Sequence, residues 1–369
     1  MSDDRLDRSR LRLRPLAERA HRHDTSVVID PAIAADPEPL DPRLASAIDE
    51  AARRVVAARM SGAAVAVAFG AHAIRNGLGL VLARLAARGF VTHLATNGAG
   101  AIHDWELAFA GATGEDVAAN LADGTFGLWE ETGRAHALAL AAGAFDGLGY
   151  GASIGRLVAG DGVVLPDRAA LDAAVRAGGE RAAAAADLAD VMDRLGAAPG
   201  PVRVAHPFRD RSLFAAAWTA GVPLTVHPGV GYDIVHGHPG MSGGALGRTA
   251  HRDFLAFAAS LEGLPGGAYL SVGSAVMSPM VFEKALAMVQ NVRRSAGLPP
   301  VAGHLIAVND LAPAEEWPAG EPGADNPAYY LRFLKTFSRA GGDLVYVQLD
   351  NRRFLVRLLL AVERLAAGG

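Results

Sequence analysis

The sequence contains no cysteine among its 369 residues. Disulfides, thiolate nucleophiles and cysteine-based zinc or iron–sulfur sites are therefore excluded. No apolar run reaches the roughly 18–20 residues of a membrane span, and the charged N-terminus lacks the apolar core of a signal peptide. The formal net charge of −4 gives no bias towards nucleic acid or an anionic membrane. We therefore expect a cytoplasmic protein that binds neither nucleic acid nor membrane.

Lysine is also nearly absent. Of the 35 lysines and arginines, only Lys284 and Lys335 are lysines. Arginine can replace lysine wherever only the charge matters, but its guanidinium stays protonated and cannot attack a carbon atom. Each remaining lysine is therefore a candidate nucleophile. The alternative is that each is a surface charge that has survived by chance.

What the sequence does contain is typical of a globular α/β protein, with 51% hydrophobic and 20% charged residues. Short apolar runs rich in β-branched residues alternate with segments of helical composition and spacing. This alternation predicts a Rossmann-like, mostly parallel sheet with helices on both faces. The expected strands are 63–69, 90–96, 201–206, 224–227, 268–272, 304–308 and 344–348.

We expect a single α/β domain over residues 25–369, preceded by an arm and carrying one insertion. Residues 1–24 are rich in arginine and aspartate and have little apolar periodicity, which predicts a disordered or loosely ordered arm. Residues 142–200 hold an alanine-rich helix, at about 168–195, between glycine and proline breaks. We expect this segment to be a helical insertion packed on the sheet.

Two strand-to-helix connections are rich in glycine. The first follows the strand at 63–69 and reads GAH at 70–72, then NG at 76–77. The second reads NGAG at 97–100 and would point backbone N–H groups and a positive helix end at a phosphate. His103 stands where the dinucleotide fingerprint has its third glycine. A tight turn without a ligand is therefore the alternative interpretation.

The stretch 222–239 gathers three histidines and a carboxylate around the end of a short buried strand. His227 ends that strand, and Asp233, His236 and His238 follow it in a loop. A buried parallel strand that ends in glycine and polar residues is typical of a ligand site at the carboxyl edge of an α/β sheet. With His206, these side chains would also suit zinc, so a metal-dependent hydrolase is an alternative function. Imidazoles at strand ends also serve as ordinary buried polar groups.

Longer segments are similar to a known family. They are FGAHAIRNGL at 69–78, LATNGAGAIHDWELA at 94–108, the stretch 113–133, VPLTVHPGVGYDIVHGHP at 222–239, GGAYLSVGSAVMSPMVFEKAL at 266–286, and YYLRFLKTF at 329–337 with GGDLVYVQLD at 341–350. In this order they resemble the deoxyhypusine synthase family, in particular its bacterial deoxyhypusine synthase-like branch. The resemblance implies a transferase of polyamine metabolism that binds NAD. It also implies a homotetramer with shared active sites.

The reaction implied by the resemblance is an NAD-dependent aminobutyl-type transfer from spermidine or a related polyamine, as in hypusine or homospermidine synthesis. The lysine that forms the imine intermediate falls on Lys335, in agreement with the scarcity of lysine. Asp233 would hold an ammonium group, Phe333 would pack on the polyamine, and Asp310 or the loop after it would bind the other nitrogen. The implied NAD contacts are Asn76, Gly77, Asn97, Gly98, Ala99, Gly273, Ser274, Asp350 and Asn351.

The sequence departs from the family at the position of the catalytic base. The family has a histidine just after the glycine turn at 273, where this chain reads Ser278-Pro279-Met280. A proline cannot take a proton, so His103, His227 or His236 would have to act, and we expect His103 and His236 to be catalytic. The changed proton handling favours a small amine over a protein lysine as the acceptor. A third possibility is a catalytically silent homologue that has kept the cofactor site.

Overall fold

The computed structural model describes residues 6–36, 38–314, 321, 323–326, 329 and 331–368. Its centre is a six-stranded parallel sheet, which confirms the expected Rossmann-like α/β fold. The strands lie in the order β10-β9-β8-β2-β3-β7. They are β2 (Val65–Phe69), β3 (His93–Thr96), β7 (Leu224–Val226), β8 (Ala268–Val272), β9 (Leu305–Asp310) and β10 (Asp343–Gln348).

The direction in which the chain builds the sheet reverses once. From β2 the chain builds outwards through β3 to β7, then returns to the other side of β2 and builds outwards through β8 and β9 to β10. This is the strand order of the doubly wound dinucleotide-binding fold. Ligands of such folds lie outside the carboxyl ends of the strands, where the order reverses. In this chain that place lies between β2 and β8.

Alternate residues of β2 face two different layers of helices. Val65, Val67 and Phe69 belong to one core, whereas Ala66 and Ala68 belong to another. This period of two is expected for a strand that is buried on both faces. The first core is shared with α1 (Pro42–Ser61), α3 (Gly79–Ala87) and α14 (Asn351–Gly368), and the second with α11 (Gly243–Ser260), α12 (Met277–Ser295) and α13 (Arg332–Phe337).

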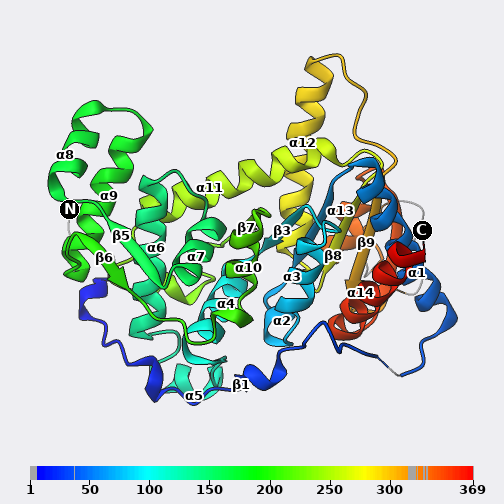
Figure 1. The fold of residues 1–369 in the computed structure, drawn as a ribbon. Coiled ribbons are helices and arrows are strands. Elements are labelled where there is room, and N and C mark those ends of the chain that lie inside the picture. The colour runs from blue at the N-terminus through cyan, green and yellow to red at the C-terminus, as the bar shows by residue number, and fades with distance from the viewer. Residues whose placement is uncertain are drawn as a thin grey trace.

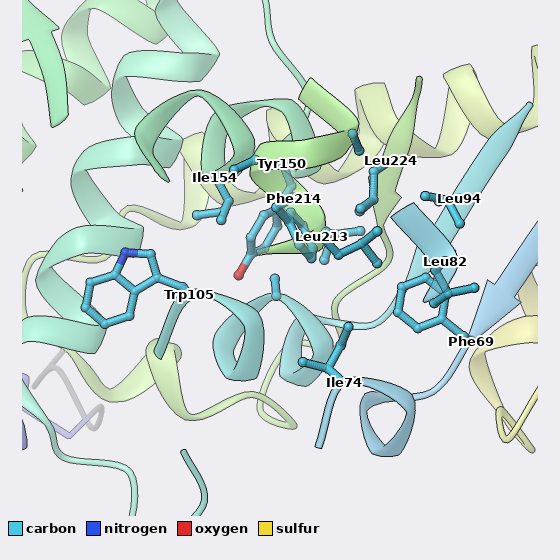
Figure 2. Packing of buried hydrophobic residues seen from close by; sticks show 14 of the residues in the cluster. Phe69, Ile74, Leu82, Leu94, Trp105, Tyr150, Ile154, Leu213, Phe214 and Leu224 are labelled. Carbon is cyan, nitrogen blue, oxygen red and sulfur yellow. The ribbon is translucent and has the colours of Figure 1, made fainter. Parts of the chain in front are cut away.

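Further helices extend the domain beyond β7, opposite the β10 side of the sheet (Figure 1). Among them, α6 is buried along nearly its whole length, as expected for a helix that is apolar all round. Figure 2 shows how Trp105, Tyr150 and Phe214 continue the apolar packing away from Phe69 and Leu82. These helices are α4 (Gly98–Ala110), α5 (Val117–Ala122), α6 (Glu130–Phe145), α7 (Tyr150–Ala159) and α10 (Leu213–Ala220), whereas the short α2 (Ala71–Arg75) directly follows β2.

Within the described residues, no single helix has both the length and the apolar composition needed to cross a membrane. Helices α6 and α7, which are bent by 113° at their junction, meet those two criteria only when they are taken together.

The insertion contains two helices and a small sheet, and the structure corrects the sequence-based prediction here. Strand β6 (Gly200–Arg203) does not join the main sheet as expected for 201–206, because it pairs antiparallel with β5 (Gly162–Leu165). The expected single helix is broken into α8 (Arg168–Ala177) and α9 (Glu180–Leu195). The break falls at Gly178 and Gly179, whose positive φ of 76° a helix cannot accommodate.

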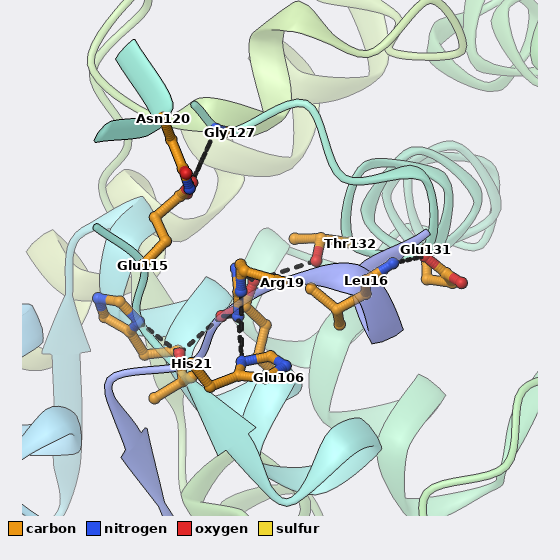
Figure 3. A network of polar contacts seen from close by, with 11 residues as sticks. Leu16, Arg19, His21, Glu106, Glu115, Asn120, Gly127, Glu131 and Thr132 are labelled. Atoms are coloured by element: carbon orange, nitrogen blue, oxygen red, sulfur yellow. Dashed lines mark hydrogen bonds and ion pairs between the residues drawn. The ribbon is translucent and has the colours of Figure 1, made fainter. Parts of the chain in front are cut away.

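The sequence favours a loosely ordered arm at 1–24, whereas the structure describes residues 6–24 as a strap along the domain. Its strand β1 (His23–Asp24) pairs with β4 (Ala112–Thr113). The Arg19 guanidinium donates to both carboxylate oxygens of Glu106, at 2.8 and 2.7 Å, and both side chains are buried (Figure 3). The Leu16 amide donates to the Glu131 carboxylate in the same view. A buried ion pair would leave an uncompensated charge if the strap detached, so it ties the strap to the domain.

The approach of the loops after β2 and β8 gives the first testable prediction. A Cβ atom at Gly70 would lie 2.1 Å from the carbonyl oxygen of Gly273, which is backbone and cannot swing away. We therefore expect Gly70→Ala to destabilise the protein by about 1–3 kcal/mol. The measurement is the free energy of unfolding in urea.

Gly247 provides the matched control for this substitution. It lies inside α11 with open space around its Cβ position and no positive φ. Gly247→Ala should therefore leave stability unchanged or raise it by up to about 1 kcal/mol. Equal effects of the two substitutions would show that the contact between the two loops does not constrain the fold.

Candidate functional site

The carboxyl ends of the sheet strands are joined to one another where the strand order reverses. The Gly70 amide donates to the Val272 carbonyl oxygen at 3.0 Å, and the Gly273 amide donates to the Asn309 carbonyl oxygen at 2.8 Å. Gly273 has a φ of 54°, in the left-handed region that favours glycine. The loops after β2, β8 and β9 are thus held side by side.

A cavity of about 220 Å³ opens at this place, and we call it the Asn309 cavity. Its walls come from α2 and from the loops after β8, β9 and β10. It is lined by His72, Asn76, Gly273, Asn309, Asp310, Leu311, Leu349, Asp350 and Asn351. Five of these residues, Asn76, Gly273, Asp310, Asp350 and Asn351, are among the site residues expected from the sequence.

Side-chain hydrogen bonds hold the walls of the Asn309 cavity in place. The Asn76 Nδ2 donates to Asn351 Oδ1 at 2.8 Å, which joins α2 to α14. Asp310 Oδ1 accepts from the Ala312 amide at 3.0 Å, and Asp350 Oδ1 accepts from the Arg352 amide at 2.8 Å. Each of these carboxylates leaves its Oδ2 free of these bonds. The cavity therefore combines amide groups with negative charge.

His72 lies at the rim of the Asn309 cavity, on α2. Partial burial, and then the positive charge of Arg75, lower the pKa of the His72 imidazole. A lowered pKa means that the imidazole is neutral at pH 7 and can accept a proton. The sequence analysis did not single out His72, although it directly follows the glycine turn after β2.

A second cavity, of about 420 Å³, lies on the other side of α2, and we call it the Arg75 cavity. The strap, α2, α4 and the loops 114–118 and 232–234 all contribute walls. It is lined by Arg19, Arg22, Arg75, Ala99, Ile102, His103, Glu106, Gly114, Glu115, Asp116, Val117, Ala118, Phe126, Tyr232, Asp233 and Ile234.

Most charges of the Arg75 cavity are already paired within the protein. Besides the Arg19–Glu106 pair, Arg22 lies 2.5 Å from the Asp116 carboxylate. His103 Nδ1 lies 2.7 Å from the Thr113 hydroxyl, and burial lowers the pKa of His103 to about 4. Such a histidine is neutral at physiological pH and can serve as a hydrogen-bond partner or as a weak base.

Asp233 lies over the start of α4. A Cβ atom at Gly98 would meet Asp233 Oδ2 at 2.2 Å, so glycine is required for this approach. Burial raises the pKa of Asp233, and hydrogen bonds from the Gly229 and Ala99 amides act in the opposite direction. Asn97, expected to contact NAD, caps α4 by accepting from the Gly100 amide at 2.9 Å. A protein carboxylate therefore lies where the sequence suggested a phosphate.

Each of the three histidines at 227–238 has a different hydrogen-bond partner. His227 Nε2 lies 3.1 Å from the Thr225 hydroxyl, His236 Nε2 lies 3.1 Å from the Gly229 carbonyl oxygen, and His238 Nε2 lies 3.4 Å from Glu130. Among the described residues, no three histidine, aspartate or glutamate side chains are placed to hold one metal ion. The alternative of a metal-dependent hydrolase built on this cluster therefore lacks its geometry.

Neither Lys335 nor Phe333 is among the described residues that line the two cavities. Lys335 Nζ lies 3.6 Å from Glu321 Oε1 and 3.6 Å from the centre of the Tyr329 ring. Phe333 is buried in the core and stacks on Tyr346. The loop at 315–320, one source of the expected second acid, lies outside the described residues.

The remaining expected cofactor contacts have structural partners. A Cβ atom at Gly77 would lie 1.8 Å from the Val27 carbonyl oxygen, so this glycine allows the segment after the strap to approach α2. The Ser274 hydroxyl accepts from the Ser278 amide at 3.1 Å and starts the turn into α12. Neither residue is among the described residues that line the two cavities.

No protein-family model matches the sequence, and no curated protein does. Similar solved structures include AgrE in a ternary complex with ornithine and NAD+, with 15% identity and a TM-score of 0.44. Another is apo ArgZ, an arginine dihydrolase from the ornithine–ammonia cycle in cyanobacteria, with 16% identity and a TM-score of 0.40. A third is an LOR/SDH protein from Methanococcus maripaludis S2, with 12% identity and a TM-score of 0.41.

The three matches cover 90%, 86% and 90% of this chain, and 34%, 32% and 70% of the other proteins. The chain thus spans about one third of the length of AgrE and ArgZ. Structural similarity at these TM-scores and sequence identities does not indicate what this chain binds or which reaction it catalyses.

The identification with the deoxyhypusine synthase family is wrong. Neither the family models nor the curated proteins support it, and the solved structures above are named for other proteins. The aminobutyl transfer, the polyamine substrate, the homotetramer and the imine intermediate came from that resemblance and are withdrawn with it, whereas Lys335 stays a candidate nucleophile from the scarcity of lysine. Expectations that do not depend on it, namely the α/β fold and a ligand site at the carboxyl edge, are unaffected.

The environment of His72 gives a second prediction. Because burial and the charge of Arg75 both lower its pKa, we expect the His72 imidazole to titrate below its ordinary value of about 6.5. Replacing Arg75 by glutamine removes the second cause, so the pKa of His72 should rise. Nuclear magnetic resonance titration of the imidazole protons measures both values.

Arg88→Gln is the control, because Arg88 is not among the charges that act on His72. It should leave the titration of His72 unchanged. A pKa of His72 at or above 6.5, or one that Arg75→Gln does not move, would contradict the described placement of α2.

Proposed function

We propose that the chain is the NAD-binding domain of an NAD-dependent oxidoreductase that acts on a small polar molecule. The observation that carries this proposal is the reversal of strand order between β2 and β8, with two glycine turns and a cavity directly outside it. In doubly wound sheets this is where a dinucleotide crosses the carboxyl edge. The proposal does not depend on likeness to any other protein.

The residues at this place fit a dinucleotide. Gly70 lets the loops after β2 and β8 approach each other, and Gly273 leaves the backbone bare on the wall of the cavity, which permits the close approach of a pyrophosphate. The amides of Asn76 and Asn351 face the same cavity and can donate hydrogen bonds to phosphate or ribose oxygens. The 18-residue helix α14 begins at Asn351, and the Asp350 carboxylate already accepts from the Arg352 amide at its positive end.

NAD would supply a hydride acceptor or donor at this site. The chain's own part is to bind, orient and move a proton. His72, neutral at physiological pH, can take the proton of an alcohol or amine that loses a hydride from the adjacent carbon. Asp310 and Asp350 place negative charge at the cavity and favour a substrate that carries or develops positive charge there.

The amide of Asn351 offers the most direct test of the proposed dinucleotide site. Asn351→Asp keeps the shape and can still accept from Asn76, but it adds a negative charge beside the crevice. Repulsion of the pyrophosphate should weaken NADH binding about tenfold, equivalent to about 1.4 kcal/mol. The measurement is NADH fluorescence on titration of the full chain.

Asn291 is the charge-matched control, since it lies exposed on α12. Asn291→Asp should leave NADH affinity as in the wild type. Absence of NADH binding by the wild-type chain would reject the proposal outright. Equal affinities of the two variants would place the dinucleotide elsewhere on the molecule.

A further inference from the structure

Asn309 is the last but one residue of β9 and is almost fully buried, with 1% of its surface exposed. Its Nδ2 donates to the carbonyl oxygens of Val347 and Leu349, at 3.0 and 2.7 Å. Because two acceptors face this atom, the other side-chain atom must be the oxygen. The orientation of the amide is therefore fixed by β10 and the residue after it.

The Asn309 side-chain oxygen has no hydrogen-bond partner among the described residues. A buried acceptor without a donor destabilises the protein. Such groups in native proteins call for an explanation, and a bound ligand is one. Asn309 is one of the residues that line the cavity of the proposed dinucleotide site, and a ligand that displaces the groups covering its side-chain oxygen can supply the donor.

The size and walls of the Asn309 cavity favour a flat ring. Its volume of about 220 Å³ is below the roughly 300–1,000 Å³ of pockets that enclose a whole ligand, so it suits one part of a dinucleotide. Leu311 and Leu349 provide apolar walls for a ring, and Asn309 provides one acceptor.

The strand order indicates which end of the dinucleotide lies there. In the doubly wound fold the adenosine ribose is bound by the residue after the second strand of the sheet, which is β3 in this chain. The nicotinamide then extends in the opposite direction, over β8 and β9, where the Asn309 cavity is found. The nicotinamide ring carries a carboxamide, whose NH2 is a hydrogen-bond donor.

We propose that Asn309 Oδ1 accepts a hydrogen bond from the carboxamide NH2 of the nicotinamide ring, an inference that rests on the proposed NAD site. Asn309 is then a positioning and specificity-determining residue, because it selects a dinucleotide that bears this donor. It also fixes the rotation of the ring about its glycosidic bond, and hence which face of the ring meets the substrate.

The test uses the wild-type full chain and four probes. They are NAD, 3-acetylpyridine adenine dinucleotide, nicotinamide hypoxanthine dinucleotide and ADP-ribose, with affinities measured by calorimetry. The acetylpyridine analogue has the same charge as NAD and a similar shape but lacks the NH2 group, so we expect it to bind about tenfold more weakly than NAD. The hypoxanthine analogue changes only the adenine end and should bind like NAD.

Asn309→Ser should remove the preference for NAD over the acetylpyridine analogue while leaving the affinity for ADP-ribose unchanged. Asn291→Ser, on the exposed face of α12, is the control and should keep the preference. If Asn309→Ser fails to fold because β9 and β10 lose two hydrogen bonds, the comparison of probes on the wild type still decides the question.

Two results would overturn the inference. Equal affinity of the wild type for NAD and the acetylpyridine analogue would show that Asn309 meets no carboxamide. Discrimination against the hypoxanthine analogue instead would show that the adenine amine occupies this cavity. In both cases NAD still binds, so the proposed function stands. Failure of both NAD and ADP-ribose to bind would instead reject the proposed function and this inference with it.

Discussion

The close approach of Gly70 to the Gly273 carbonyl is the constraint on which the proposed site depends. It brings the loops after β2 and β8 together, and the amide of Gly273 then joins the loop after β9. Because Gly70 lacks a side chain, the Gly273 carbonyl can pack against it, and Gly273 then lines the cavity with bare backbone. The cavity beside it, with its amides and carboxylates, exists only because these loops start from neighbouring parallel strands. A side chain at Gly70 would push the two loops apart. A side chain at Gly273 would project towards Asn351, on the opposite wall of the cavity.

Buried ionic groups then fix the other side of α2. The Arg19–Glu106 pair, with hydrogen bonds from the Thr113 and Thr132 hydroxyls to Glu106, joins the strap to α4 and α6. Two further buried carboxylates act in a similar way on backbone amides. Asp253 accepts from Gly151 and Val226, and burial raises its pKa to about 7. Asp104 caps α10, and burial raises its pKa to about 6. Polar groups thus position helices that the apolar core alone would leave free to slide.

The sequence predicts the fold and part of the site, for reasons that particular residues make clear. Continuous apolar runs such as 65–69 mark strands buried on both faces, and the carboxyl ends of parallel strands must meet at one edge. Asn76, Gly273, Asp310, Asp350 and Asn351 were named by the family resemblance and not by the strand pattern, and they line one cavity at this edge. The strand expected at 201–206 was assigned to the wrong sheet, because an alternating pattern does not name its pairing partner.

Other features depend on contacts between distant segments, which one sequence does not contain. The burial of Arg19 requires Glu106, 87 residues away, and the free oxygen of Asn309 is defined only by the carbonyls after β10. The resemblance to deoxyhypusine synthase rested on strand ends and glycine turns. Strand ends and glycine turns of this kind are needed by any parallel sheet, so they say little about the chemistry at its edge. The identification was wrong for that reason.

The central claim is that a dinucleotide crosses the carboxyl edge of the sheet between β2 and β8. Hydrogen–deuterium exchange of the full chain, with and without NAD, tests this most directly. The account expects slower exchange of backbone amides at 70–77, 273–275, 309–311 and 349–352, and unchanged exchange in α8 and α9. Protection confined to the loop at 229–241, or none at saturating NAD, would contradict it.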